Sequence, residues 1–187
     1  MVEILTARKH LTDIAEWRKL GEASIFQSDS RLELIEGEIF EMPPIGPNHA
    51  SHVKRLIQLF SGLVQNRAMI SVQDPLQLGE FSEPQPDLML LRPVADFYRE
   101  KHPGPSDVLL LIEVADQTLG FDRNQKHDLY AAYNIPEYWI VNLNQGCLEG
   151  YREPLNKIYK EKTILFAGDR ITLSQLAGIT IDLKDIL

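Results

Sequence analysis

Helices interleaved with buried strands predict an α/β or α+β fold, in which helices flank a central mixed β-sheet. The apolar run DVLLLIEV at 107–114 is typical of a strand covered on both faces, and EYWIVNL at 137–143 indicates a second core strand. Apolar residues recur at helical spacing over 48–67, and a second helix is expected at 122–134. Without an internal repeat or a long linker, residues 1–187 are expected to form a single domain.

The composition is that of an ordinary globular protein, since 44% of the 187 residues are hydrophobic and 25% are charged. A chain of this length buries roughly 70% of its unfolded surface, so it needs no disulfide, and the single Cys147 cannot form one internally. No stretch approaches the roughly 20 apolar residues of a membrane span, and MVEILTARKHLTDIAEW lacks the apolar core of a signal peptide. We therefore expect a cytoplasmic protein with no membrane partner.

Local signals set the expected helix and hairpin boundaries. Thr12 is the expected cap of a short helix at 13–20 that ends at Gly21, and Asn48 is the expected cap of the long helix. RLELIEGEIFEM, at 31–42, predicts two short strands around a turn at 36–37. Asp122 is the expected cap of the last helix, with Gln125 as its capping-box partner.

The other strands are expected at 69–78 and 87–93, on either side of a loop rich in proline and polar residues. Near the C-terminus, CLEGYRE at 147–153, KIYKEKTIL at 157–165 and ITIDL at 179–183 indicate antiparallel edge strands. The mixed sheet is therefore expected to carry these strands at its margin.

Two carboxylates occupy strand ends, where ligands commonly bind. Asp87 opens a strand after Pro86, and Glu113 ends an apolar strand on the face that also holds Leu109 and Leu111. A charge on an apolar face costs several kcal/mol unless it is paired or coordinated. If the two strands are antiparallel neighbours, the carboxylates meet and repel unless a divalent ion lies between them.

Oxygen ligands of this kind suit Mg²⁺ or Mn²⁺, and the main-chain carbonyl of Val114 is a further candidate ligand. The helix that follows the strand is expected to bring Lys126 toward the same corner, with Tyr130 one turn later. The combination predicts a site built from two carboxylates, a metal ion and a lysine.

The segments PQPDLMLL and LLLIEVADQTLGFDRNQKHDLYAAY resemble the PD-(D/E)XK, or restriction-endonuclease-like, nuclease superfamily. From LTDIAEW to the C-terminal strands, the chain is similar in order and spacing to its Uma-type branch. The superfamily usually carries a lysine two residues after its second acidic residue, where this chain has Ala115. The resemblance implies that the lysine has moved to the next helix as Lys126, since a long side chain can reach the same point from there.

The resemblance implies a restriction-endonuclease-like fold and a metal-dependent endonuclease that cuts DNA. Asp87 and Glu113 would hold Mg²⁺, for which Mn²⁺ can substitute, and Lys126 would assist the attacking water. The superfamily often adds an acidic residue from the first core helix, but 48–60 contains none. The expected substitutes, in order of preference, are Glu38, His49 and Glu33.

Structural interpretations of the same residues stay open. His49 could be a hydrogen-bonded core histidine, Asp116 a solvated loop residue, and Glu113 with Lys126 a buried ion pair without catalytic use. Several aromatic residues are expected in the core rather than in a base-stacking surface, namely Tyr130, Tyr133, Tyr138 and Trp139.

Three function classes follow. The first is the endonuclease, and the alternative is a catalytically silent nucleic-acid-binding or assembly module. That alternative is motivated by Ala115 and by a net charge of −8, which repels polyanions unless a local basic group or a metal ion intervenes. A two-carboxylate hydrolase acting on sugars is a distant third.

The candidate phosphate contacts are scattered, namely Arg92, Arg99, Lys101, Arg123 and His127. A homodimer is compatible with C-terminal edge strands.

Overall fold

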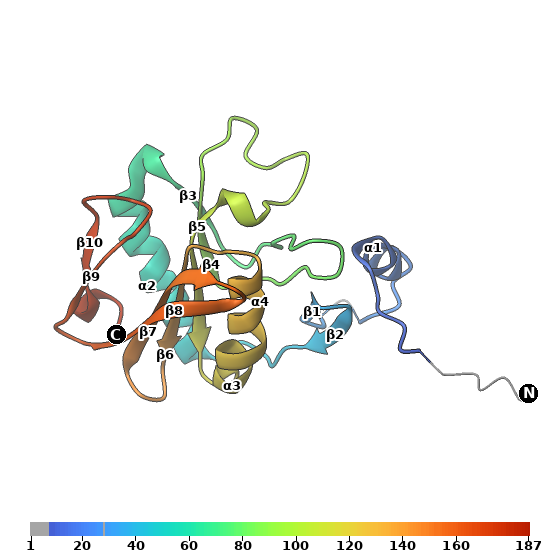
Figure 1. Cartoon of the computed structure of the whole chain (residues 1–187). Coiled ribbons are helices and arrows are strands. Elements are labelled where there is room, and N and C mark those ends of the chain that lie inside the picture. The colour runs from blue at the N-terminus through green and yellow to red at the C-terminus, as the bar shows by residue number, and fades with distance from the viewer. Residues whose placement is uncertain (1–7, 28) are drawn as a thin grey trace, which may run out of the picture.

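The computed structural model describes residues 8–27 and 29–187 and confirms the predicted fold class (Figure 1). Within this described part, a six-stranded mixed sheet has the order β3-β4-β5-β6-β7-β8. β5 and β6 run parallel, and every other neighbouring pair in this sheet is antiparallel. The strands are β3 (Met69–Ser71), β4 (Leu88–Leu91), β5 (Val108–Ala115), β6 (Glu137–Asn142), β7 (Cys147–Leu155) and β8 (Ile158–Phe166).

One face of the sheet packs against the long helix α2 (Pro47–Val64). Its apolar stripe includes Leu56 and Phe60, which are fully buried against residues of β4, β5 and β6. The C-terminal segment completes this layer with the small sheet of β9 (Arg170–Thr172) and β10 (Thr180–Asp182). Figure 1 shows α2 and this segment on the same side of the central sheet.

The other face packs against the crossover that joins the parallel strands β5 and β6. This crossover consists of a short helix α3 (Leu119–Phe121), a π-helical turn at Asp122–Lys126 and helix α4 (His127–Ala132). Tyr130 and Tyr138 are fully buried in this layer, and Trp139 is fully buried on the α2 side, so all three are core residues as predicted.

An N-terminal unit lies beside this layer, with α1 (Ile14–Glu22) and the hairpin of β1 (Leu32–Ile35) and β2 (Glu38–Glu41) (Figure 1). The predicted hairpin turn is confirmed, because Glu36 and Gly37 both have positive φ, as a tight turn between twisted strands requires. Of the helices in the described part, none combines the length and the apolar run that crossing a bilayer demands.

Two expected helix caps are wrong by one or two residues. The cap of α1 is Asp13 rather than Thr12, and it forms a capping box within the first turn. The cap of α2 is Gly46 rather than Asn48, because Pro47 occupies the first helical position, where its missing N–H is not needed. The N-terminus of α2 therefore has no side-chain cap.

The crossover helix begins at Leu119, three residues before the expected start. The prediction that Asp122 caps it is wrong, because Asp122 lies inside the helical segment and its Oδ2 accepts a hydrogen bond from the hydroxyl of Thr118 at 2.6 Å. Asp122 is buried because its side chain lines a polar pocket together with Glu113 and Lys126.

The C-terminal strands differ from expectation in where they pair. β7 is not an edge strand, because it lies between β6 and β8, and within the described part β8 forms that edge of the sheet. The ITIDL segment forms β10, which pairs with β9 in a separate sheet. At the other edge, the strand expected over 69–78 ends at Ser71, a few residues before Pro75.

A bulge in β5 changes the expected faces of its first residues. Leu90 is opposite Leu110 while Leu91 is opposite Val108, so Leu109 is the extra residue and packs with the α2 layer. Beyond the bulge the alternation is regular, and Leu111 and Ala115 pack on the crossover side.

Candidate active site

The register of β4 and β5 brings two predicted carboxylates together. Leu88 is opposite Ile112 in an antiparallel pair, so Asp87, one residue before β4, lies beside Glu113. The Asp87 N–H donates to Glu113 Oε2 at 3.3 Å, and the Val114 N–H donates to Asp87 Oδ2 at 2.9 Å. Both side chains are buried, and the predicted neighbouring of the two strands is confirmed.

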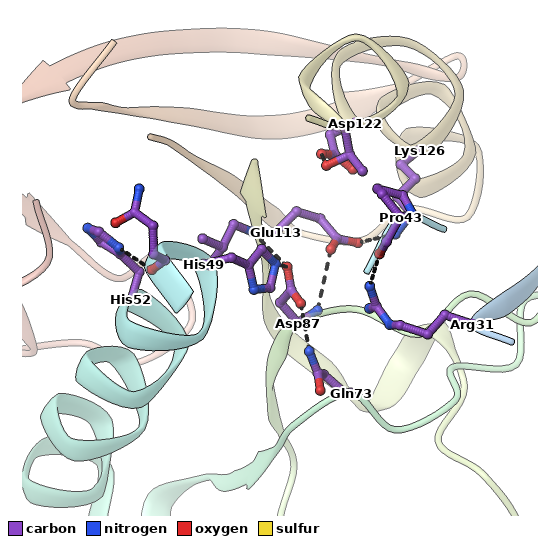
Figure 2. Close-up of polar contacts among 12 residues, drawn as sticks. Arg31, Pro43, His49, His52, Gln73, Asp87, Glu113, Asp122 and Lys126 are labelled. Carbon is purple, nitrogen blue, oxygen red and sulfur yellow. Dashed lines mark hydrogen bonds and ion pairs between the residues drawn. The ribbon is translucent and has the colours of Figure 1, made fainter. Parts of the chain in front are cut away.

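Lys126 extends from the π-helical turn toward the same corner (Figure 2). Its Nζ lies 2.9 Å from Glu113 Oε1 and 3.1 Å from both carboxylate oxygens of Glu33. The hydroxyl of Tyr130, one turn later, donates to Glu113 Oε1 at 2.8 Å. A lysine from the helix thus contacts Glu113 in a chain that has Ala115 at the usual lysine position.

The acidic residue nearest to Lys126 on the hairpin is Glu33, not Glu38. Glu38 is exposed, pairs with Lys9, and lies opposite Ile35 near the turn. Glu33 is two residues farther from the turn than Ile35, and its side chain is 4% exposed. The order of preference put Glu38 first, whereas the contacts with Lys126 favour Glu33 for this role.

The hairpin is docked by contacts far apart in the sequence. The Glu83 N–H donates to Leu34 O at 2.7 Å, and the Gly37 N–H donates to Phe81 O at 2.7 Å. Since 81–83 belong to the loop that leads to Asp87, these bonds set the position of the hairpin beside the carboxylates. No sequence pattern within 31–42 distinguishes Glu33 from Glu38 in this respect.

His49 and Gln73 hold Asp87 on its other side (Figure 2). His49 Nε2 lies 2.9 Å from Asp87 Oδ2, and Gln73 Nε2 donates to Oδ1 at 3.1 Å. Burial favours a raised pKa for Asp87, but the bonds from His49, Val114 and Gln73 outweigh it, so the pKa lies below its usual value. His49 therefore faces the carboxylate, while its buried Nδ1 has no hydrogen-bond partner among residues 8–27 and 29–187.

Asp122 is the carboxylate that the cap interpretation missed. It is 2% exposed, lines the same pocket as Glu113 and Lys126, and has its pKa raised to about 6, mainly by burial. The sequence could have indicated this from the spacing of Asp122 and Lys126, because residues four apart on a helix share a face. Asp116, at the end of β5, lines the pocket and is partly buried, so it is not a freely solvated loop residue.

The cluster is short of positive charge. Four buried carboxylates surround one buried lysine: Glu33, Asp87, Glu113 and Asp122. Burial raises the pKa of Glu113 to about 8 even though Lys126 opposes the shift. The pKa of Lys126 is raised because the neighbouring carboxylates outweigh its own burial, so the ammonium is charged. The raised pKa values of Glu113 and Asp122 show that ionising these buried carboxyl groups is costly, and a bound cation would offset that cost.

A cavity of about 50 Å³ opens above these groups. One wall is the segment 42–46 that leads into α2, and the opposite wall is 116–118 after β5. Lys126 and Arg31 are the lysine and arginine side chains that line it within the described residues. Its polar lining consists of Arg31, Glu33, His49, Gln85, Asp87, Glu113, Asp116, Gln117, Thr118, Asp122 and Lys126.

The candidate phosphate contacts, which the sequence favoured as solvated surface charges, lie away from this pocket. Arg92, Arg99 and Lys101 belong to the loop between the end of β4 and the start of β5, which is the end of the sheet opposite to Asp87 (Figure 1). Arg123 binds the buried carboxylate of Glu149, and His127 lies 2.8 Å from an oxygen of Asp128. None of these five side chains lines the pocket.

Known proteins are similar to this chain in sequence pattern and in fold. A family model with the description "Putative restriction endonuclease", Uma2, matches residues 15–184. Among solved structures, the fold is similar to a crystal structure from Anabaena variabilis ATCC 29413 described as "a putative nuclease belonging to DUF820". The TM-score is 0.70 with 15% sequence identity, over 93% of this chain and 96% of that chain, which is a likeness of fold. No curated protein matches the sequence.

Proposed function

Because the chain belongs to the Uma2 family of restriction-endonuclease-like proteins, we propose that it is a Mg²⁺-dependent endonuclease that hydrolyses phosphodiester bonds of DNA. The observation that carries this proposal is the distance of 2.9 Å between Lys126 Nζ and Glu113 Oε1, next to Asp87. A lysine beside two carboxylates at strand ends is the donor set that such hydrolysis requires, and here the lysine comes from a helix.

The donor set fits a hard divalent cation. Asp87 and Glu113 offer carboxylate oxygens, the Val114 carbonyl is a candidate main-chain ligand, and a cation would offset the cost of ionising the buried Glu113. Across 8–27 and 29–187, no three His, Cys, Asp or Glu side chains are arranged to hold one ion together. The ion would therefore keep several waters, as Mg²⁺ usually does. When bound, it polarises the scissile phosphate and lowers the pKa of a coordinated water.

The neighbouring side chains hold the reacting groups in place. His49 and Gln73 hold Asp87, while Tyr130 and Lys126 hold Glu113, so neither carboxylate is free to rotate. An ammonium has three N–H donors. Lys126 donates one to Glu113 and one to Glu33, which leaves the third for the attacking water. Its positive charge also offsets the negative charge that develops on the phosphate.

The test is cleavage of plasmid DNA, linear DNA and RNA with Mg²⁺ or Mn²⁺. Asp87→Asn, Glu113→Gln and Lys126→Met should each lower the rate at least about 100-fold, since each removes a group that acts in the transition state. Circular dichroism should report an intact fold. Matched controls are Asp128→Asn and Lys160→Met, which remove the same charges at exposed positions and should cleave like the wild type.

Two outcomes would contradict the nuclease. If all three variants still cleaved DNA like the wild type, the cleavage would come from a contaminant. The absence of cleavage on every substrate, with no thermal shift on adding Mn²⁺, would exclude a metal-dependent enzyme. Binding of DNA without turnover would support the catalytically silent binding module instead.

A further inference from the structure

Arg31 lines the pocket at a partly exposed position, here called its mouth, whereas Asp87 and Lys126 are buried. It is not used by the chemistry proposed above. It comes directly before β1, two residues from Glu33, and lines the same cavity as Asp87 and Lys126. Its side chain points toward the segment that leads into α2, where Nη1 donates to Pro43 O at 2.8 Å (Figure 2). The side chain is thus held at the entrance rather than extended into solvent.

Most of the hydrogen-bonding capacity of Arg31 is unused. A guanidinium has five N–H donors, and among the described residues Arg31 makes the single bond to Pro43 O and no ion pair with a carboxylate. The other pocket cation is already engaged, since Lys126 contacts Glu113 and Glu33. Arg31 is therefore the cation of this pocket whose charge is not neutralised by a neighbouring carboxylate.

A phosphate that enters the pocket meets a floor of carboxylates, so it needs positive charge at the entrance. The planar fork of arginine matches two phosphate oxygens, a geometry that lysine does not reproduce. The N-terminus of α2, which has no side-chain cap, lies on the same wall at Gly46 and adds the positive end of a helix dipole.

We propose that Arg31 binds a backbone phosphate of the DNA at the mouth of the pocket and so positions the strand for cleavage. This inference rests on the proposed nuclease function and adds a substrate-positioning residue to it. The competing structural role is a clasp, in which the bond to Pro43 O only fixes the segment before α2. The two roles differ in their effect on the salt dependence of DNA binding.

The experiment measures the affinity of the full chain for a DNA duplex over a range of salt concentrations, with Ca²⁺ in place of Mg²⁺. Loss of one phosphate contact in Arg31→Gln should weaken binding about tenfold and reduce the slope of log K against log salt by about 0.9. Arg31→Lys keeps the charge but not the fork, so it should keep the slope and still bind more weakly than the wild type.

Arg67→Gln is a matched control. Arg67 also donates to a main-chain carbonyl, Ala177 O at 2.8 Å, and it follows the C-terminus of α2, about 27 Å along the helix from Gly46. Its removal takes away the same charge and the same kind of bond far from the pocket. Its affinity and salt slope should equal those of the wild type.

The outcomes separate this inference from the nuclease proposal. If the wild type cleaves DNA while Arg31→Gln retains its affinity and salt slope, Arg31 is a clasp and this inference alone fails. A lower melting temperature with an unchanged slope would likewise identify Arg31 as a clasp. If the wild type neither binds nor cleaves DNA, the nuclease proposal fails and the role of Arg31 fails with it.

Discussion

A single ammonium group, that of Lys126, is the positive charge paired with the buried carboxylates of the site. Lys126 Nζ contacts Glu113 and Glu33 at 2.9 to 3.1 Å. Burial raises the pKa of Asp122, and the charge of Lys126 opposes part of that rise. Replacing this lysine leaves buried carboxylates without a partner, which typically costs about 3–5 kcal/mol. Activity measurements on Lys126 variants therefore need the fold to be monitored at the same time.

At the same scale, Glu33 and Glu38 can be separated by experiment. Glu33→Gln removes a buried charge that contacts Lys126, so we expect cleavage to fall by about 10- to 100-fold as the lysine loses a partner that orients it. Glu38→Gln removes an exposed charge near the hairpin turn and should leave cleavage unchanged. Equal losses in both variants, measured as initial rates, would contradict the assignment of Glu33.

The crossover element delivers two functional side chains from one turn and is anchored between them. Arg123, which lies between Asp122 and Lys126, makes a bidentate ion pair with Glu149 of β7. The i→i+5 bonding of a π-helical turn changes the angular spacing of the residues it contains, and such turns occur frequently at functional sites. The ion pair between Arg123 and Glu149 thus ties the turn that carries Lys126 to β7, which is two positions from β5 in the sheet.

Element stability can be tested at two glycines. Gly62 lies in the interior of α2 with open space around its missing Cβ, so Gly62→Ala should stabilise the protein by about 1 kcal/mol. Gly37 has φ +79°, and an added Cβ would lie 2.6 Å from Leu11 Cβ, so Gly37→Ala should destabilise the hairpin. Thermal unfolding should show a rise of about 2–4 °C for the first and a fall for the second.

A decrease in melting temperature for Gly62→Ala would mean that α2 is strained at this point. The Gly37→Ala variant should also lose cleavage, because the hairpin carries Glu33.

Features that depend on local periodicity could be predicted from the sequence. The apolar run that forms β5 and the position of an acidic residue at its end could be read from the sequence. The meeting of Asp87 and Glu113 could be stated only as a condition, because it requires β4 and β5 to be antiparallel neighbours. The choice of Glu33 over Glu38 could not be predicted, because it depends on hydrogen bonds between the hairpin and 81–83. The interior position of β7 likewise depends on pairing between distant segments.

At the scale of the whole molecule, a buried carboxylate outside the pocket couples stability to pH. Glu149 is fully buried and accepts bonds from Arg123, Asn142 and Tyr151. Burial favours a raised pKa, but these bonds outweigh it and lower the pKa from 4.5 to about 2. The folded protein therefore resists protonation of Glu149 more strongly than the unfolded chain does.

The sign of the pH dependence follows from that difference. The stabilisation is fully present above pH 4.5 and is lost as the pH falls toward 2, by up to about 3 kcal/mol. Urea unfolding of the wild type should show this loss between those pH values, and Glu149→Gln should be less stable at pH 7 with a shallower pH dependence. Parallel curves for the two proteins would show that other carboxylates control acid unfolding.

The buried methyl group of Ala115 limits where the lysine of this site can be carried. It is fully buried in the layer between β5 and the crossover, so a lysine at this position would have to displace that packing. Loss of Lys126 in turn would leave Glu113 and Glu33 unpaired. The lysine cannot be moved from one position to the other by a single substitution without losing either the packing around Ala115 or the ion pairs of Lys126.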